Sequence, residues 1–89
     1  MRHCTLYLYD VKTKEALHAR LRGALMLPDY YGGNLDALND CLTDPGEETS
    51  VAVYGYDSLA ETLGGYAVTF RSVLEHAAEV NERFSVTFH

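Results

Sequence analysis

The chain has 89 residues, of which 47% are hydrophobic, so it is long enough for one packed domain spanning 1–89 and too apolar for a disordered chain. Its net charge of −6 argues against nucleic-acid binding, and the lack of a membrane-length apolar run or a secretory leader indicates a cytoplasmic protein that contacts no membrane. Two cysteines, Cys4 and Cys41, are too few for a disulfide scaffold or a structural zinc site. A Cys4–Cys41 disulfide is conceivable, but we expect free thiols in a reducing cytoplasm. We also expect neither a bound metal nor a cofactor.

The first part of the chain predicts one strand and two helices. Residues 4–10 alternate apolar and polar side chains and are rich in β-formers, which is typical of a strand. Thr13 can cap a helix that Pro28 ends. The apolar stripe of this helix consists of Leu17, Leu21, Ala24 and Leu25. Asn34 can cap a second helix that runs to about Thr43.

A turn-rich loop separates these helices from the next strand. The loop reads "DPGEET", over residues 44–49, and the strand that follows it is "SVAVYGY", over residues 50–56. Ser58 and Glu61 have the spacing of a capping box, which predicts a short helix starting at Ser58. Gly64 and Gly65 are expected to end that helix.

The last part of the chain predicts a longer helix and a final strand. The helix extends from about Tyr66 to Val80, with Phe70, Val73, Leu74 and Ala77 along one face. Residues 83–89 have the alternation of a strand. The order is therefore β-α-α-β-α-α-β. Because strands joined by helical crossovers usually lie parallel, we expect an α/β fold with a three-stranded parallel sheet covered by helices.

The second helix is amphipathic and its polar face is acidic. At about 100° per residue, one arc of roughly 160° holds only apolar side chains and Cys41. This arc consists of Leu35, Ala37, Leu38, Cys41 and Leu42, and the opposite arc consists of Asp36, Asn39, Asp40, Thr43 and Asp44. Like charges four residues apart destabilise an isolated helix, and the helix dipole disfavours acids near its C-terminal end. Helix stability therefore does not explain why all the charges on this polar face are negative, and we interpret the acids as a functional face.

The acids of this helix belong to a larger acidic region. From Gly23 to Phe70 the sequence contains eight acids and no Lys, Arg or His. This region has a charge of −8, and the two flanks together have a charge of +2, from seven basic residues and five acids. Such a field suits a basic partner, which is either a cationic protein or a metal ion. An alternative interpretation is that the acids only keep a small protein soluble.

The loop before the acidic helix contains an aromatic pair followed by glycines. Tyr30 and Tyr31 precede Gly32 and Gly33, which allow positive φ angles and the close approach of another backbone. Tyrosine is enriched in interface hot spots because it offers a large contact area and loses little rotamer entropy. We expect Tyr30 to point outward and Tyr31 to be partly buried. An aromatic loop leading into an acidic face is typical of a protein-binding patch.

The segment "LPDYYGGNLDALNDCLTD", residues 27–44, closely resembles the signature segment of the barstar family, the intracellular inhibitors of the secreted ribonuclease barnase. The resemblance implies the same fold, with three parallel strands and helices. It also implies that the protein has no enzymatic activity. The expected partner is a basic secreted, guanyl-specific ribonuclease bound 1:1, and the free protein is expected to be monomeric.

The resemblance further implies a mechanism in which the tyrosine loop and the acidic helix plug the ribonuclease active site. Asp40 would enter the phosphate-binding pocket, and Asp36 would support it from the start of the helix. The implied protein-binding residues are Tyr30, Gly32, Asn34, Leu35, Asp36, Asn39, Asp40, Thr43 and Asp44. A further contact from the last helix corresponds to either Glu75 or His76.

The chain departs from the family pattern at several positions. Asn39 replaces a bulky aromatic residue between the two aspartates, and Gly33 replaces a residue that is often acidic. The loop over residues 43–50 lacks the aromatic residue found in barstar and contains additional acids. These departures leave the identity of the target ribonuclease open.

Two other functions stay open from the residues themselves. Asp36 and Asp40 could share a divalent ion in a metal-dependent hydrolase, although no His or Lys nearby completes such a site. The chain could also be a regulatory module of the same fold that binds another basic protein. Of the histidines, His18 is expected to be a solvated helix residue, and His76 is the one that could have a role.

Overall fold

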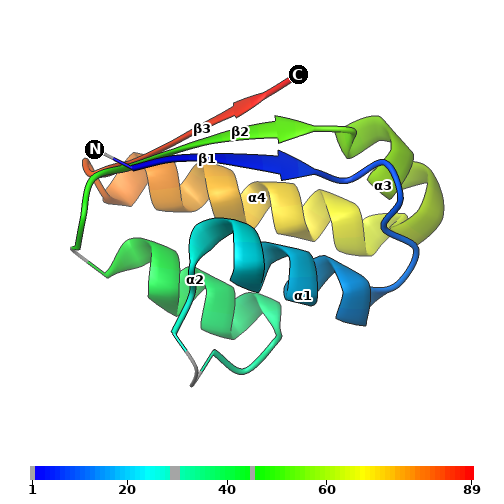
Figure 1. Cartoon of the computed structure of the whole chain (residues 1–89), viewed down its shortest axis with the longest axis horizontal. Coiled ribbons are helices and arrows are strands. Elements are labelled where there is room, and N and C mark those ends of the chain that lie inside the picture. The colour runs from blue at the N-terminus through cyan, green and yellow to red at the C-terminus, as the bar shows by residue number, and fades with distance from the viewer. Residues whose placement is uncertain (1, 29–30, 45) are drawn as a thin grey trace.

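The computed structural model describes residues 2–28, 31–44 and 46–89 (Figure 1). The elements in this part of the chain are β1 (Arg2–Tyr7), α1 (Lys14–Leu25), α2 (Leu35–Thr43), β2 (Thr49–Tyr54), α3 (Tyr56–Leu63), α4 (Gly65–Val80) and β3 (Phe84–Phe88). Their order is the predicted β-α-α-β-α-α-β. The α/β class predicted from the sequence is confirmed.

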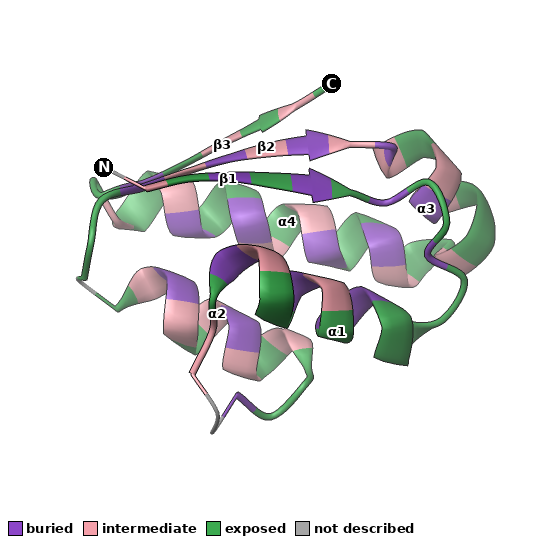
Figure 2. Cartoon of the chain, in the orientation of Figure 1, coloured by how far each residue is buried: buried purple, intermediate pink, exposed green. Residues whose placement is uncertain are grey.

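The three strands form one parallel sheet in the order β1-β2-β3. Cys4 of β1 is in register with Val51 of β2, which in turn is in register with Val86 of β3. α1, α2 and α4 all lie on the same side of this sheet (Figure 1). The buried side chains of the strands form the core with those of the helices, and buried positions alternate with more exposed ones along β1 and β2 (Figure 2).

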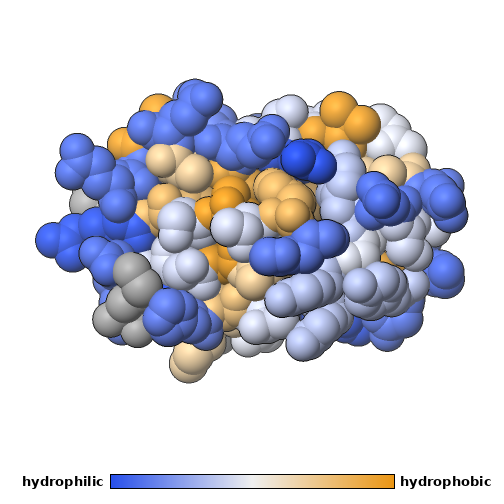
Figure 3. Space-filling view, turned by 90° about the horizontal axis from the view of Figure 1, so that it is seen from above, coloured by the Kyte–Doolittle hydropathy of each residue, from blue (hydrophilic) through white to orange (hydrophobic). Residues whose placement is uncertain are grey.

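None of the helices in the described part of the chain covers the other face of the sheet, its outer face (Figure 1). This is unusual because all-parallel sheets generally have both faces covered. The outward side chains are His3, Thr5 and Tyr7 of β1, Ser50, Ala52 and Tyr54 of β2, and Ser85 and Thr87 of β3. The ring of Tyr54 stacks on Tyr7, with centroids 5.4 Å apart, and on His89, with centroids 4.8 Å apart. Figure 3 shows this face from above, with apolar surface near its middle and hydrophilic side chains around it.

α1 begins and ends through local capping interactions. The hydroxyl of Thr13 accepts a hydrogen bond from the Ala16 N–H at 3.0 Å, as the sequence predicts. The helix ends at Leu25 because Met26 takes a left-handed conformation with φ 53°. It therefore stops before Pro28 is reached. Leu17, Leu21 and Leu25 of its apolar stripe are all buried.

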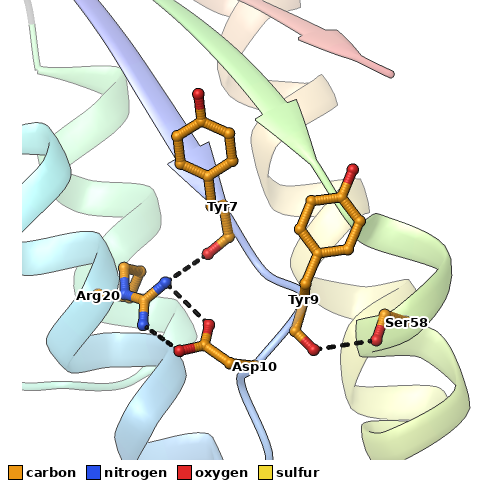
Figure 4. Close-up of polar contacts among 5 residues, drawn as sticks. All are labelled: Tyr7, Tyr9, Asp10, Arg20 and Ser58. Carbon is orange, nitrogen blue, oxygen red and sulfur yellow. Dashed lines mark hydrogen bonds and ion pairs between the residues drawn. The ribbon is translucent and has the colours of Figure 1, made fainter.

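The segment between β1 and α1 is held by Arg20 of α1 (Figure 4). One guanidinium nitrogen donates to the Tyr7 carbonyl oxygen at 2.6 Å, and two nitrogens reach the Asp10 carboxylate at 3.1 Å. This bidentate pair fixes the turn at the C-terminal end of β1. The side-chain hydrogen bonds of this pair, and then the attraction of its opposite charges, raise the pKa of Arg20 and lower the pKa of Asp10.

The capping box predicted at Ser58 and Glu61 is wrong. α3 starts at Tyr56 after Gly55, whose φ of 86° makes the turn that ends β2. A Cβ at Gly55 would lie 2.9 Å from the Tyr9 backbone nitrogen, so this close approach needs glycine. The Ser58 hydroxyl lies inside the helix and donates instead to the Tyr9 carbonyl oxygen at 3.3 Å (Figure 4). The predicted end of α3 at Gly64 is confirmed.

Over residues 2–28, 31–44 and 46–89, none of the helices combines the length and apolar character that a membrane span requires.

Candidate protein-binding site

α2 presents its acids to solvent, as the helical periodicity predicts. Leu38 and Leu42 are buried in the core, with exposed fractions of 0% and 7%. Asp36 and Asp40 are exposed on the opposite side of the helix. Asp44 is exposed as well, but it is the C-cap residue with extended backbone rather than part of the helix. The three side chains together are the acidic face.

The N-terminal end of α2 is held by its cap. The Asn34 side-chain oxygen accepts a hydrogen bond from the Ala37 N–H at 2.8 Å, which confirms the predicted cap. Gly33 precedes it with φ 71°, a left-handed conformation that favours glycine. Asp36 lies in the first turn, where the helix dipole stabilises a negative charge. The direction of the acidic helix is therefore determined by a glycine and a cap immediately before it.

The C-terminal end of α2 is tied to α4. The Asn81 amide nitrogen donates to the Leu42 carbonyl oxygen at 2.8 Å, and this satisfies one of the carbonyls that a helix end leaves without an intrahelical partner. The Thr43 hydroxyl donates to the Asn39 carbonyl oxygen at 2.7 Å. Both ends of the helix that carries Asp40 are thus fixed by hydrogen bonds. The backbone that positions the Asp40 carboxylate therefore has little freedom to move.

The acidic face has no cation to neutralise it within the part of the chain that the structure describes. The ion pairs found there are Arg2–Glu47, Arg20–Asp10 and Arg71–Glu75, and none of them includes an acid of this face. Burial raises the pKa of the Cys41 thiol, and the negative charges of Asp40 and Asp44 raise it further. The negative charges of the acidic face therefore affect the neighbouring Cys41 thiol, while the carboxylates themselves are exposed to solvent.

The other predicted contact residues surround this face. Gly32 and Asn34 are exposed before the helix, and Leu35, Asn39 and Thr43 are partly buried along its flanks. The structure thus places these residues next to the acidic face. Tyr30, for which we expect an outward orientation, lies outside the described residues.

Tyr31, which we expected to be partly buried, is buried with 8% of it exposed, and its hydrogen-bond partner was not predicted. The Tyr31 hydroxyl is hydrogen-bonded to Nδ1 of His18, and Nε2 of the same ring is 2.6 Å from the Tyr66 hydroxyl. The expectation that His18 is solvated is therefore wrong, since only 5% of it is exposed. The helical spacing contained a signal for this, because at about 100° per residue His18 lies roughly 20° from Leu25 at the edge of the apolar stripe.

The two candidates on α4 lie on different flanks of that helix. Glu75 faces Arg71, with Nε and Oε2 3.5 Å apart, and the Arg71 guanidinium lies 4.2 Å from the centroid of the Phe88 ring of β3. At about 100° per residue, Glu75 is roughly 180° from Tyr66 and His76 is roughly 80° from it. His76 is exposed, and it is thus the candidate nearer to the flank of α4 that contacts Tyr31 through His18.

Among the described residues, no group of three or more His, Cys, Asp or Glu side chains lies close enough together to hold a metal ion. Within the described residues, Asp36 and Asp40 therefore have no third protein ligand of the kind that a hydrolytic metal site would use.

Comparison with known proteins relates this chain to ribonuclease inhibitors. The sequence matches the Barstar family, described as Barstar (barnase inhibitor), over residues 1–89. It is also 41% identical over 71 residues to the Bacillus subtilis (strain 168) protein named "Putative ribonuclease inhibitor YrdF". That alignment covers 79% of this chain and 78% of the relative.

Proposed function

Because this chain belongs to the barstar family of barnase inhibitors, we propose that it inhibits a basic, secreted, guanyl-specific ribonuclease by occupying its active site. The observation that carries the proposal is the acidic face of α2, which is exposed, without a cation within the described residues, and held at both ends. Such a face suits an enzyme cleft whose cationic residues otherwise bind RNA phosphates.

Asp40 is the proposed central contact. It lies near the middle of the acidic face, one helical turn from Asp36 and one from Asp44. In the ribonuclease cleft its carboxylate would take the place of an RNA phosphate and pair with arginine and histidine side chains. Asp36 and Asp44 would add negative charge on either side. The repulsion among the three acids in the free protein is then relieved by the cations of the enzyme.

The remaining contacts are proposed to surround Asp40 and exclude water. Tyr30, Gly32, Asn34 and Leu35 come from the loop and first turn, and Asn39 and Thr43 flank the acids along the helix. On α4 we favour His76 over Glu75, since Glu75 already faces Arg71. The complex is proposed to be 1:1, formed in the cytoplasm by an otherwise monomeric protein, without nucleic acid, membrane, metal or cofactor.

The side chain of Asn39 bears on which ribonucleases the protein could bind. A bulky aromatic residue at this position would fill space between the aspartates and the enzyme, whereas the Asn39 amide is smaller and polar. We therefore propose that the target ribonuclease presents a polar or protruding group opposite Asn39. The alternative is that the same acidic face binds a basic protein other than a ribonuclease.

The test is a titration of this protein against a panel of secreted, guanyl-specific bacterial ribonucleases, with RNA cleavage as the readout. We expect complete inhibition of at least one enzyme at a 1:1 molar ratio, lost in Asp40→Ala. Asp57→Ala is a matched control, because Asp57 is an exposed acid on α3, away from α2 (Figure 1). Inhibition of no enzyme in the panel would favour the alternative partner, and equal loss in both variants would show a general charge effect.

A further inference from the structure

We propose that a cavity at the end of the molecule where the strands begin binds a free α-amino acid with an apolar side chain. The cavity has a volume of about 150 Å³. It is lined by the first residues of the three strands, the ends of α1 and α2, and the loop after α2, which meet at one end of the molecule (Figure 1). This proposal is independent of the proposed inhibition of a ribonuclease, because it concerns a different ligand in the free protein.

One part of the cavity lining is apolar. Leu25, Leu42 and Phe84 line it and are buried, with exposed fractions of 2%, 7% and 5%, and Leu27 lines it from the segment after α1. The Cys41 thiol belongs to the same lining, and it is uncharged at pH 7 because burial raises its pKa. These side chains suit the apolar body of a small ligand.

A second part of the lining is a guanidinium group with a donor that the protein does not use. Arg2 lines the cavity, and its Nε is buried without a hydrogen-bond partner among the described residues. Its Nη1 lies 3.7 Å from Glu47 Oε2, which is too long for a hydrogen bond. A buried donor without a partner lowers stability, so the group favours a ligand that brings an acceptor. A carboxylate pairs with Nε and an Nη of a guanidinium together.

The third part of the lining is acidic. Asp44 and Glu47 line the cavity and are both exposed to solvent. Their carboxylates repel a ligand that is only an anion, and Arg2 repels a ligand that is only a cation. A ligand that complements all three parts has a carboxylate, an ammonium group and an apolar body. An α-amino acid with an apolar side chain has this composition.

The volume of the cavity limits the size of the ligand. An apolar protein cavity of about 150 Å³ holds a molecule of the size of benzene. The side chain of valine or leucine fits such a space, and the charged groups of the amino acid then lie toward solvent, where 61% of the Glu47 side chain is exposed. The larger side chain of tryptophan does not fit.

The first test is an NMR titration of the free protein with L-leucine, so it does not require a ribonuclease. We expect saturable shifts of the Leu42, Gly46 and Thr49 amides, with a dissociation constant of about 5 mM or lower for a ligand of this size. The amide of Asp57, in α3 at the other end of the molecule (Figure 1), should not shift. Shifts that do not saturate at roughly ten times that concentration would overturn the proposal.

The second test separates the parts of the ligand. 4-Methylpentanoate is leucine without the ammonium group, and 3-methylbutylamine is leucine without the carboxylate. Each should bind at least about five-fold more weakly than L-leucine, because each loses one charge-assisted contact. Glycine and L-tryptophan should also bind more weakly, since one lacks the apolar body and the other exceeds the cavity. Equal binding of 4-methylpentanoate would show a simple anion site, and equal binding of glycine would exclude a role for the apolar lining.

The third test changes the protein. Arg2→Gln should weaken leucine binding at least about ten-fold, and Glu47→Gln, at an exposed loop position, at least about three-fold. Because Arg2 Nε has no partner among the described residues, Arg2→Gln should not lower the Tm of the free protein. Arg83→Gln is the matched control, since it makes the same change of charge at an exposed arginine, and it should leave the affinity within about two-fold of wild type. Equal weakening by Arg2→Gln and Arg83→Gln would show a general charge effect and contradict the site.

Discussion

The side-chain amide of Asn81, directly after α4, donates to the carbonyl oxygen of Leu42 in α2 at 2.8 Å. Its own side-chain oxygen accepts from the Arg83 N–H at 3.0 Å. One residue therefore ends α4, turns the chain toward β3 and satisfies the last turn of the acidic helix. The rigidity of the proposed binding surface depends on a residue that does not belong to it.

Asn81→Ala is expected to lower the free energy of unfolding by about 1–2 kcal/mol, because the partly buried Leu42 carbonyl loses its partner. Urea unfolding measures this change. Glu82→Ala, one residue further on and exposed, is the control and should change stability by less than about 0.5 kcal/mol. Equal effects of the two substitutions would mean that the bond to α2 contributes nothing to stability.

Asp40→Ala is expected to weaken binding to the inhibited ribonuclease by more than about 2 kcal/mol, because it leaves buried enzyme cations without a partner. The barnase–barstar pair is itself the reference system for this effect, so the magnitude is taken from relatives of this chain and is not independent of them. Calorimetry or dissociation kinetics gives the value. Binding by Asp40→Ala within error of wild type would remove Asp40 from the centre of the interface.

The association rate should fall as salt is added, because the acidic face attracts a basic enzyme over a distance that ions screen. Between about 0.05 M and 0.5 M NaCl we expect a decrease of roughly ten-fold or more, with a smaller change in the dissociation rate. Stopped-flow mixing separates the two rates. An association rate that does not depend on salt would mean that the enzyme docks elsewhere.

Two glycine substitutions test the geometry of the loop. Gly33→Ala should destabilise the protein by about 1 kcal/mol, because alanine disfavours the φ of 71° although no atom lies within 4 Å of the added Cβ. Gly23→Ala is the matched change within α1, where the added Cβ also meets nothing within 4 Å, and it should stabilise by about 0.5–1 kcal/mol. Thermal unfolding distinguishes these opposite signs.

The buried His18 should make stability depend on pH. Burial lowers its pKa in the folded protein below the ordinary value of 6.5, so the unfolded chain binds the proton more tightly. The stabilising contribution is complete above pH 6.5 and is lost as the pH falls from 6.5 through the folded-state pKa. His18→Gln should remove this slope from urea titrations over that range, and His76→Gln, at an exposed position, should retain it.

Much of the site could be predicted from the sequence because its features are local. The Asn34 cap, the span of α2 and the outward direction of Asp36 and Asp40 all depend on residues within a few positions of one another. The same holds for the order of strands and helices, and parallel pairing follows from the helical crossovers. Partial burial of Tyr31 was predicted as well, and the structure buries this residue more completely than expected.

Other features depend on segments that are far apart in the chain. Ser58 has the spacing of a cap, but the close approach of Tyr9 to Gly55 moves the start of α3 to Tyr56. The choice between Glu75 and His76 depends on which flank of α4 faces the loop before α2, and this became known only from the contact of Tyr66 with His18 and the contact of Arg71 with the β3 ring of Phe88.

The sequence by itself therefore determined the element order, the acidic helix face and its cap, because periodicity and capping act over one or two helical turns. Only the tertiary structure decided the environment of His18, which bonds a tyrosine 13 residues away and another 48 residues away. No local pattern specifies such contacts, since they arise when separate elements pack onto one face of the sheet.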